Sequence, residues 1–326
     1  LSEGQLVILK STVPPGTTAH MIRPTLERSS GLVAGTDFGL VCSPERLAEG
    51  NVLKDLETIP VIIGGVDARS SKLAATFWNS LFGVATVMVS SPTVAELAKM
   101  ADNVWIDLNI ALANEFAKVC DQLKVDVLEV INAANTLPKG SSNVNILLPG
   151  VGVGGYCLPK DPHFLSYVAH KNSIEIELPK TSRKINDEMP RYVFRSLRQL
   201  VGGRSKVKVA VLGLAFKNNT GDMRNTPVKP LVDLMLSEGY IVKLFDPLVD
   251  RSEAEDLFEL SLADSAEEAV ENADIVAVLA CHDYFKSELL LGKIKSLAKQ
   301  GCVVYDGRNS ISEKVVTASG LSYKGV

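Results

Sequence analysis

The sequence lacks the features that mark several large classes of protein. Its strongly apolar stretches, such as Ile275–Cys281, are far shorter than the roughly 20 residues that span a bilayer. The 34 basic and 38 acidic residues give a net charge of -4 without a long basic run. Because proteins that read nucleic acid normally carry a basic face, that class is disfavoured. We therefore expect neither a membrane nor a nucleic acid as a partner.

Paired cysteine motifs and clustered histidines are also missing. The five cysteines are odd in number and contain no CxxC pair: Cys42, Cys120, Cys157, Cys281 and Cys302. This pattern indicates neither a disulfide framework nor a zinc site, and it favours the reduced cytoplasm. The four histidines are dispersed without metal-ligand spacing, so structural or surface roles are expected for them. No metal is predicted.

What the sequence does contain is an ordinary globular composition. It has 326 residues, of which 46% are hydrophobic and 22% charged, close to the average for folded domains. This length suggests about two domains. The chain starts at Leu1, and residues 6–10 already read as a buried strand. We therefore expect the sequence to enter a domain part-way through.

Apolar runs alternate with helical patterns over residues 1–90. Strands are predicted at 6–10, 39–43, 60–64 and 84–89, and helices at 17–27 and 68–81. This alternation is typical of a parallel α/β sheet. Residues 93–134 contain neither proline nor glycine and predict one long amphipathic helix, or a long helix broken near 123–125.

The rest of the chain predicts a loop-rich segment, a helix and a second sheet. Loops are expected at 135–163 and a helix at 180–200. Strands are expected at 206–212, 240–245, 274–280 and 302–305, with helices at 226–237 and 266–271. The fold class is α/β, with two Rossmann-like parallel-sheet units joined by a long central helix and the first unit incomplete. We divide the chain into residues 1–90, 91–200 and 201–326.

The densest motif is PGVGVGGYCLPKDP at Pro149–Pro162. Its glycines permit positive φ and close approach to a ligand. Cys157 is followed by Lys160 and Asp161, and a nearby cation favours the nucleophilic thiolate. A glycine-rich turn with a structural cysteine explains the spacing equally well.

Other motifs place polar groups where α/β proteins bind ligands. Lys99 and Asn103 share one helix face and could hold an oxyanion or a water, although a solvated face explains them alone. Glu45 and Arg46 follow a strand, where they could act as a base and an anion clamp or form an ordinary charged loop. Loops after the strands 206–212 and 302–305 lie where α/β sheets bind phosphates.

Taken in order, six motifs resemble the UDP-glucose/GDP-mannose dehydrogenase family. They are STVPPGTT (11–18), SPERLAEG (43–50), ELAKMADN (96–103), GVGGYCLPKDP (152–162), GLAFKNNTGDMRNTP (213–227) and YDGRN (305–309). The resemblance implies a nucleotide-sugar 6-dehydrogenase that uses two NAD molecules to oxidise a sugar C6 alcohol to a carboxylate. It further implies a UDP-sugar substrate, a role in polysaccharide biosynthesis and a homodimer formed through the long helix.

The same resemblance implies roles for individual residues. Cys157 would form a thiohemiacetal and then a thioester, Lys99 would stabilise the oxyanion, and Asn103 and Asp161 would position water. Glu45 would serve as the acid/base residue in thioester hydrolysis. Cofactor contacts fall on Thr12, Glu49 and Arg224, and substrate contacts on Arg46, Leu47, Gly154, Phe216, Lys217 and Arg308.

Two loops resemble the branch of the family that oxidises UDP-N-acetylmannosamine. They are PER at 44–46 and VNILLPGVGVGGYC at 144–157. Residues 137–143 depart from that branch, which usually has His-Pro-Arg before VNIL, and Tyr156 stands where it has histidine. UDP-glucose, UDP-N-acetylglucosamine and GDP-mannose therefore stay open as substrates.

This family begins its NAD-binding domain with a GxGxxG turn after the first strand, and the sequence has no such turn in its N-terminal part. We expect the chain as given not to turn over by itself, because the pyrophosphate-binding turn is missing. A non-catalytic UDP-sugar-binding protein is the alternative from another class. A hydroxyacid-type dehydrogenase with a similar two-domain plan is a third interpretation.

Overall fold

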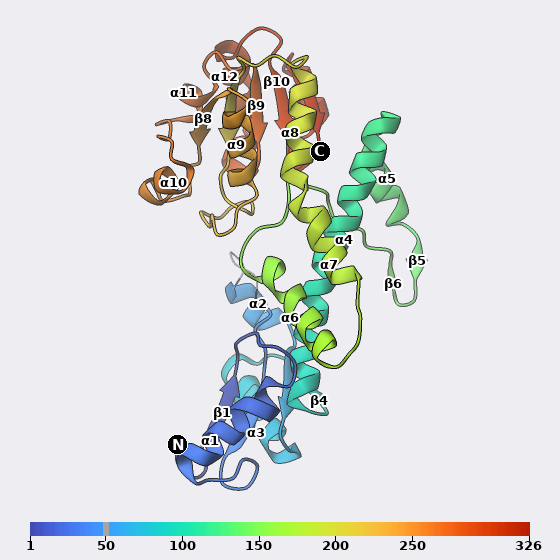
Figure 1. Ribbon diagram of the computed structural model, residues 1–326, viewed down its shortest axis with the longest axis vertical. Coiled ribbons are helices and arrows are strands. Elements are labelled where there is room, and N and C mark those ends of the chain that lie inside the picture. The colour runs from blue at the N-terminus through green and yellow to red at the C-terminus, as the bar shows by residue number, and fades with distance from the viewer. Residues whose placement is uncertain (48–51) are drawn as a thin grey trace. The chain divides into compact units, whose positions relative to one another are not determined.

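A computed structural model describes residues 1–47 and 52–326. The chain divides into two compact units, each treated separately below. The N-terminal unit comprises Leu1–Trp105 and Lys160–Lys180, and the C-terminal unit comprises Ile106–Pro159 and Thr181–Val326. Figure 1 shows the elements of both. Across the described residues, no helix combines the length and apolar character needed to cross a membrane.

The N-terminal unit is built on a four-stranded sheet in the order β1-β2-β3-β4. Its strands are β1 (Leu6–Leu9), β2 (Gly39–Cys42), β3 (Val61–Gly65) and β4 (Thr86–Val89). A π-helical turn (Thr18–Ile22) leads into α1 (Arg23–Ser30), followed later by α2 (Val52–Thr58) and α3 (Ala68–Phe82). Trp78 and Ala74 of α3 pack on Val41 and Ile63 of the sheet, which buries one of its faces.

This first sheet is not wholly parallel, and in that respect the prediction was wrong. β1 pairs parallel with β2 and β3 with β4, but β2 and β3 are antiparallel, with Val41 opposite Gly65. A parallel pair needs a crossover that returns the chain to the opposite end of the sheet. The connection after β2 instead carries α2, a helix of seven residues, and β3 starts at the edge where β2 ends.

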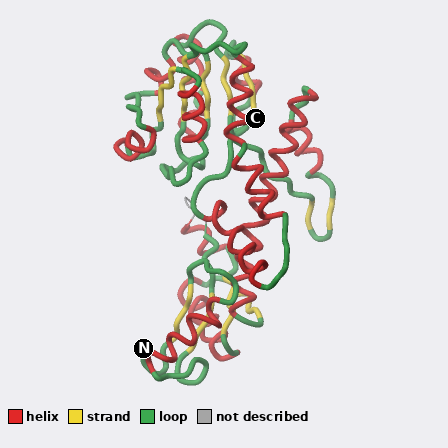
Figure 2. Tube along the Cα trace, in the orientation of Figure 1, coloured by secondary structure: helices red, strands yellow, loops and turns green. Residues whose placement is uncertain are grey.

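The predicted long helix is present, and it is broken near residues 123–125, the second of the two expected forms. α4 (Pro92–Leu123) ends before Lys124, whose φ of 58° lies outside the helical region. Asp126 then caps α5 (Val127–Ala134) by accepting a hydrogen bond from the backbone N–H of Leu128 at 2.8 Å. Helix and strand segments are coloured separately along the trace in Figure 2.

Among the predicted segments, one loop and one helix differ from the structure. The expected loop 135–163 contains a short hairpin of β5 (Pro138–Lys139) and β6 (Ser142–Asn143), and α6 (Cys157–Lys171) already starts at the cysteine. The expected helix 180–200 is two helices, α7 (Leu178–Asp187) and α8 (Met189–Leu200). The division falls at Glu188, because Pro190 occupies the first turn of α8 and fits a helix start better than an interior.

The C-terminal unit contains a five-stranded, wholly parallel sheet in the order β11-β10-β9-β7-β8. Its strands are β7 (Lys208–Leu212), β8 (Ile241–Phe245), β9 (Ile275–Val278), β10 (Val303–Asp306) and β11 (Ser322–Gly325). Its other helices are α9 (Val228–Ser237), α10 (Arg251–Phe258), α11 (Ala266–Val270), α12 (Glu288–Leu297) and α13 (Glu313–Ala318). The Rossmann-like prediction for this unit is confirmed.

Alternate residues of β7 face opposite sides of this sheet. Val209 and Val211 join the core cluster that includes α8 and α9, whereas Ala210 and Leu212 join the cluster that includes α11 and α12. Helices therefore cover both faces (Figure 1). The strand order changes direction between β7 and β9, and such open sheets bind ligands outside the carboxyl ends of the strands at that point.

Candidate active site

Cys157 differs from the other cysteines in exposure. It is exposed as the first residue of α6, whereas Cys42, Cys120, Cys281 and Cys302 are buried. Burial raises the pKa of Cys42 and of Cys281 to about 12 and that of Cys302 to about 11. Because the thiolate is the nucleophile, these protonated buried thiols are poorly suited to attack a substrate.

The glycine-rich loop before Cys157 is pressed against Phe216. A Cβ at Gly154 would lie 2.5 Å from the Cβ of Phe216, and a Cβ at Gly155 would lie 3.1 Å from its ring. Gly155 also has a φ of +78°, in the left-handed region that glycine adopts most easily. Both positions therefore require glycine, one for space and the other for space and backbone conformation.

Backbone contacts join the same loop to residues 224–225. The N–H of Gly155 donates to the carbonyl of Arg224 at 2.7 Å, and Nδ2 of Asn225 donates to the carbonyl of Gly155 at 3.1 Å. The Arg224 guanidinium bonds to Asp222 at 2.8 Å and lies 4.8 Å from the centre of the Tyr156 ring. Two predicted contact residues, Arg224 and Phe216, thus lie beside the cysteine loop.

Arg308 lies at the carboxyl edge of the parallel sheet, after β10. Its Nε donates to the carbonyl of Leu279 at 2.9 Å and a terminal nitrogen donates to that of Phe216 at 2.6 Å. Burial lowers the pKa of Arg308 to about 10, with the charge of Asp306 opposing that shift. Arg308 therefore fixes the backbone at Phe216. Lys217, the next residue in the chain after Phe216, is exposed.

In the N-terminal unit, three predicted catalytic residues form a connected group. Nζ of Lys99 donates to Oδ1 of Asn103 at 3.2 Å, and Nδ2 of Asn103 donates to Oδ2 of Asp161 at 2.5 Å. Lys160 donates to the other oxygen of Asp161 at 2.6 Å. Asn103 and Asp161 are buried. The helical spacing predicted Lys99 and Asn103 on one face of α4, and α6 supplies the carboxylate of Asp161.

The charged loop after β2 is organised by Glu45. Its carboxylate accepts hydrogen bonds from the N–H groups of Arg46 and Leu47 at 2.8 Å and lies 3.3 Å from Nζ of Lys10. Partial burial raises the pKa of Glu45, but the Leu47 N–H and the charge of Lys10 outweigh it, so this pKa lies below its ordinary value. Glu45 is thus a carboxylate at neutral pH.

Two further predictions concern the neighbours of Glu45. Nε of Arg46 forms an ion pair with Asp102 at 2.9 Å, so the guanidinium is already engaged within this unit. The predicted cofactor residue Glu49 lies outside the described residues.

Thr12 lies in the loop at the carboxyl end of β1. This loop is fastened by Glu96, a buried residue of α4 whose carboxylate accepts from the N–H of Gly16 at 2.6 Å and from the N–H and hydroxyl of Thr18 at 2.8 and 2.6 Å. The motif ELAKMADN contained Glu96, but spacing gave no sign that it would anchor a loop about 80 residues earlier in the chain.

Ser43 directly follows β2. Because β1 and β2 run parallel, it lies at the same edge of the sheet as the loop after β1. Its hydroxyl is buried and has no hydrogen-bond partner within the described part of the chain. Leaving a buried hydroxyl unpaired costs free energy, so this position suits a bound ligand or an ordered water that supplies the partner.

A buried network in the C-terminal unit was not foreseen from the sequence. Oδ1 of Asn114 accepts from the N–H of Gly150 at 2.9 Å, and its Nδ2 donates to Asn186 at 2.9 Å. Asn186 in turn bonds Asp107, which pairs with Arg183 at 2.5 Å. The network holds the start of the glycine-rich loop. Its residues are far apart in the sequence, so no local spacing pattern could predict it.

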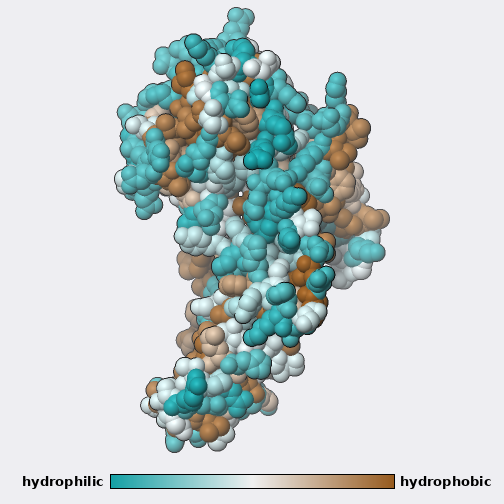
Figure 3. Space-filling model, viewed as in Figure 1, coloured by the Kyte–Doolittle hydropathy of each residue, from teal (hydrophilic) through white to brown (hydrophobic). Residues whose placement is uncertain are grey.

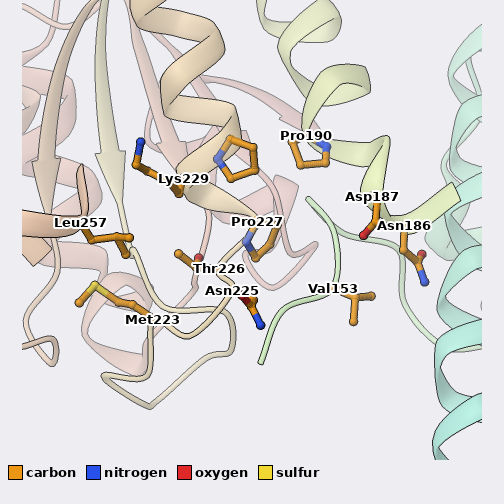
Figure 4. Close-up of a pocket in the computed structure, with 11 residues that line it drawn as sticks. Val153, Asn186, Asp187, Pro190, Met223, Asn225, Thr226, Pro227, Lys229 and Leu257 are labelled. Atoms are coloured by element: carbon orange, nitrogen blue, oxygen red, sulfur yellow. The ribbon is translucent and has the colours of Figure 1, made fainter. Parts of the chain in front are cut away.

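A cavity of about 430 Å³ lies in the same unit (Figure 4). Val153 and Asp187 flank it on one side, with Met223 and Leu257 on the other. None of its described lining residues is a predicted catalytic or substrate residue. This cavity is therefore not the site that those residues would form. Within the described residues, no three His, Cys, Asp or Glu side chains are grouped to hold a metal ion.

The chain matches known proteins along its whole length. Three domains of the UDP-glucose/GDP-mannose dehydrogenase family match it: the NAD binding domain at residues 1–82, the central domain at 93–188 and the UDP binding domain at 210–313. UDP-N-acetyl-D-mannosamine dehydrogenase of Pyrococcus horikoshii is 37% identical, over 100% of this chain and 73% of that protein. The chain belongs to the UDP-glucose/GDP-mannose dehydrogenase family.

Solved structures of this dehydrogenase family share the fold. The structure of the Pyrococcus horikoshii UDP-D-ManNAc dehydrogenase has a TM-score of 0.86 at 36% identity, covering 100% of this chain and 73% of that one. An NDP-N-acetyl-D-galactosaminuronic acid dehydrogenase from Methanosarcina mazei has a TM-score of 0.84 at 35% identity, covering 100% and 70%.

Membership in the family identifies the chain as an NAD-dependent oxidoreductase. Thr12, Ser43 and Glu45 fall in the span that matches the NAD binding domain, whereas Phe216, Lys217 and Arg308 fall in the UDP binding domain. The unpaired hydroxyl of Ser43, together with Thr12 in a fastened loop at a strand end, fits the binding of a dinucleotide.

Proposed function

We propose that the protein is a UDP-N-acetyl-D-mannosamine 6-dehydrogenase, which oxidises the C6 alcohol of the sugar to a carboxylate. Relatives named for this activity are 37% and 33% identical to the chain. The motif residues 44–46 and 144–157 support the same substrate. The observation that carries the chemistry is the exposed Cys157 at the start of α6, on a helix that also holds Asp161.

Cys157 is the proposed nucleophile. Its thiolate adds to the C6 aldehyde formed in the first oxidation and gives a thiohemiacetal, which still carries the hydrogen that the second oxidation removes. The product of that second step is a thioester on Cys157. The buried, protonated state of the other four thiols supports this assignment.

Lys99, Asn103 and Asp161 are the proposed electrostatic group. The ammonium of Lys99 stabilises the negative oxygen that develops as the sulfur adds to the aldehyde. Asn103 holds Lys99 through its carbonyl oxygen and Asp161 through its amide nitrogen, so the group is ordered before substrate arrives. Asp161 and Asn103 position the water for proton transfer.

Glu45 is the proposed base in thioester hydrolysis. Since its pKa lies below the ordinary value, the carboxylate is ionised at neutral pH and can take a proton from the attacking water. The thiolate of Cys157 leaves, and the uronic acid is released.

Cofactor and substrate contacts complete the proposal. NAD, when bound, takes up a hydride in each of the two oxidations. Thr12, Glu49 and Arg224 would hold NAD, and Arg46, Leu47, Gly154, Phe216, Lys217 and Arg308 would bind the UDP-sugar. The chain would work as three parts, with residues 1–90 on NAD, 91–200 carrying the cysteine loop and 201–326 on UDP.

Two further parts of the proposal concern the surroundings of the enzyme. The exposed apolar side chains of α4 support a homodimer formed through that helix. The exposed Cys157 must stay reduced to react, which favours the cytoplasm.

A substrate panel tests the proposed function. The enzyme that carries this sequence is assayed for NADH at 340 nm with UDP-N-acetylmannosamine, UDP-N-acetylglucosamine, UDP-glucose and GDP-mannose. We expect the highest kcat/KM with the first. Equal values for all four would overturn the substrate assignment, and a higher value for another sugar would replace it.

Two variants test the chemistry. Lys99→Met is expected to lower kcat at least about a hundredfold with little change in KM, because the lost interaction acts on the oxyanion. Lys72→Met, which removes an exposed lysine of α3, is the matched control and should leave kcat unchanged. A normal kcat for Lys99→Met would contradict the oxyanion role.

A further inference from the structure

The loops that follow β7 and β9 meet at the carboxyl edge of the C-terminal sheet. A Cβ at Gly213 would lie 2.1 Å from the carbonyl oxygen of Ala280, so only glycine permits this approach. The first of these loops carries Phe216 and Lys217, two of the proposed substrate contacts. Its chain closes on itself, since the N–H of Phe216 donates to the carbonyl of Asp222 at 3.0 Å. Asn219 lies within the closed part.

His282 follows β9 and is buried beside this loop, with 1% of its surface exposed. Its Nε2 lies 2.9 Å from Oδ2 of Asp246, and its Nδ1 lies 2.8 Å from the backbone nitrogen of Asn219. The His282 ring thus joins the carboxyl end of β8 to the middle of the loop that carries Phe216 and Lys217.

The two contacts fix the protonation of the ring. A backbone N–H can only donate, so Nδ1 of His282 must be the unprotonated acceptor, and Nε2 carries the hydrogen that Asp246 accepts. Burial works against ionisation of Asp246, but the hydrogen bonds from His282 and from the N–H of Leu214 hold its pKa below the ordinary value. The ionised carboxylate therefore keeps the imidazole in this single tautomer.

Side-chain contacts around the ring hold the same stretch of loop. Oδ1 of Asn218 accepts from the N–H of Cys281 at 2.8 Å, and Oδ1 of Asn219 accepts from the N–H of Asp283 at 2.8 Å. These two asparagines are exposed or half-buried. The contact from His282 comes from a buried ring, and it acts on the backbone of the loop rather than on a side chain.

We propose that His282 is a positioning residue for the UDP-sugar. By accepting the N–H of Asn219, it fixes the loop that presents Phe216 and Lys217, and it acts on the substrate only through that loop. This inference rests on the proposed function, because it assumes that the loop binds a UDP-sugar. Asp246 has further partners besides His282, since it also accepts hydrogen bonds from the N–H groups of Leu214 and Leu248 at 2.7 and 2.8 Å.

Two amide variants separate the two contacts of the ring. In His282→Asn the side-chain oxygen can take the place of Nδ1 and accept from Asn219, while the contact with Asp246 is lost. In His282→Gln the longer amide can reach Asp246 as a donor, while the acceptor for Asn219 is lost. Both variants are neutral and each removes one contact of the buried ring, so a general loss of packing would affect them alike.

Binding of UDP to the 326-residue chain is measured by calorimetry. His282→Gln is expected to bind UDP about tenfold more weakly than the unaltered protein, the effect of one lost hydrogen bond. His282→Asn should stay within about threefold. His170→Gln, at an exposed histidine of α6, is the control for an unrelated substitution. Equal weakening in the asparagine and glutamine variants would overturn the proposal.

Amide exchange of Asn219 tests the loop without any ligand. We expect the Asn219 N–H, followed by NMR, to exchange faster in His282→Gln than in His282→Asn or the unaltered protein. If the unaltered chain binds no UDP, the proposed function and the substrate role of His282 both fail, while the exchange data still report whether the ring orders the loop. Equal exchange in all three proteins would overturn that ordering role itself.

Discussion

At the scale of single residues, burial separates the five cysteines into two kinds. Four lie in cores, where the pKa of the thiol is raised, and Cys157 is exposed at the start of a helix. We predict that iodoacetamide at pH 7.5 modifies Cys157 first and leaves the other four unmodified while the protein stays folded, because alkylation requires an accessible thiolate. Peptide mass spectrometry of the native, briefly treated protein measures this.

A denatured sample provides the control for that experiment, since all five cysteines should then react. Cys157→Ser should abolish labelling of the native protein and leave its melting temperature within about 2 °C, since an exposed side chain contributes little to packing. Rapid labelling of Cys42 or Cys281 in the folded protein would contradict the assignment of exposure.

Glu45 gives a prediction on pH. Its lowered pKa depends on the Leu47 N–H and on Lys10, which together outweigh the opposing effect of burial. Lys10→Met removes the cation and leaves the burial, so the pKa of Glu45 should rise. The carboxylate is then lost at a higher pH as the solution is acidified, and the acid limb of the pH–rate profile should move upward with it.

A titration of the Glu45 carboxyl carbon by NMR measures that shift directly. Lys54→Met, which changes a lysine of the nearby α2 that lies at an exposed position, is the control and should leave the titration in place. A carboxyl that titrates identically with and without Lys10 would show that the ion pair contributes nothing to its ionisation.

Residue-level prediction from the sequence succeeded where partners were close in the chain or carried by a motif. The spacing of Lys99 and Asn103 placed them on one helix face, and they are hydrogen bonded. His282 was expected to be structural or on the surface, because the histidines lack metal-ligand spacing. Its partners Asp246 and Asn219 are 36 and 63 residues away and were not predicted. Spacing reports only local neighbours, so a pair formed across a sheet edge leaves no pattern.

At the scale of elements, the glycine-rich loop depends on close contact with the loop that carries Phe216. Gly154→Ala would place a Cβ 2.5 Å from Phe216 and 2.7 Å from the carbonyl of Asn225, so one of the two segments must move. We predict a loss of about 1–3 kcal/mol in the free energy of unfolding, the usual range for overpacking, together with weaker binding of UDP. Chemical denaturation and calorimetry measure the two effects.

Gly292→Ala is the matched control for that substitution. Gly292 lies inside α12 with nothing within 4 Å of its Cβ position, and alanine is the better helix former by about 1 kcal/mol. This variant should therefore be neutral or slightly stabilised. A Gly154→Ala protein as stable as the Gly292→Ala protein would mean that the loop tolerates the added methyl group.

Element prediction missed α2, α10, α12, α13 and β11, and it misplaced helix boundaries within proline-containing segments. Glycines before Cys157 suggested a loop, yet α6 begins at that residue, because a glycine-rich entry does not prevent a helix from starting after it. Pro190 marks the start of α8, but the apolar pattern continues across 180–200 and hides this division. Apolar periodicity was more dependable for the buried strands, such as β7 and β9, whose alternate residues pack on opposite faces.

At the scale of the whole molecule, the pattern of strands and helices predicted the α/β class but not every strand direction. The C-terminal sheet is parallel throughout, as expected, whereas β3 runs against β2 in the N-terminal unit. A strand has the same apolar run in either direction. Direction depends on whether the connection crosses the sheet, and that depends on packing rather than on local pattern.

An exposed apolar surface on the C-terminal unit leads to the last prediction. Leu112, Val119 and Leu123 of α4 are 46, 54 and 67% exposed, and Val130 of α5 is 37% exposed. Figure 3 shows apolar side chains over α5 and the adjoining part of α4. Since Leu112 and Val119 are seven residues apart, they lie on one face of the helix. Apolar patches of this kind mark surfaces that bind another protein, and a second copy of the chain is the proposed partner.

Val119→Glu should convert the dimer into a monomer, because it would bury an unpaired charge in the interface. Sedimentation equilibrium at about 20 μM measures the change in mass. Leu248→Glu alters another exposed apolar residue, 50% exposed and remote in sequence from α4, so it controls for added charge and should remain dimeric. A monomeric unaltered protein would contradict the proposed dimer. A Val119→Glu protein that stays dimeric would show that this face of α4 is not the interface, because an interface centred on Val119 cannot accept a buried carboxylate without a partner cation.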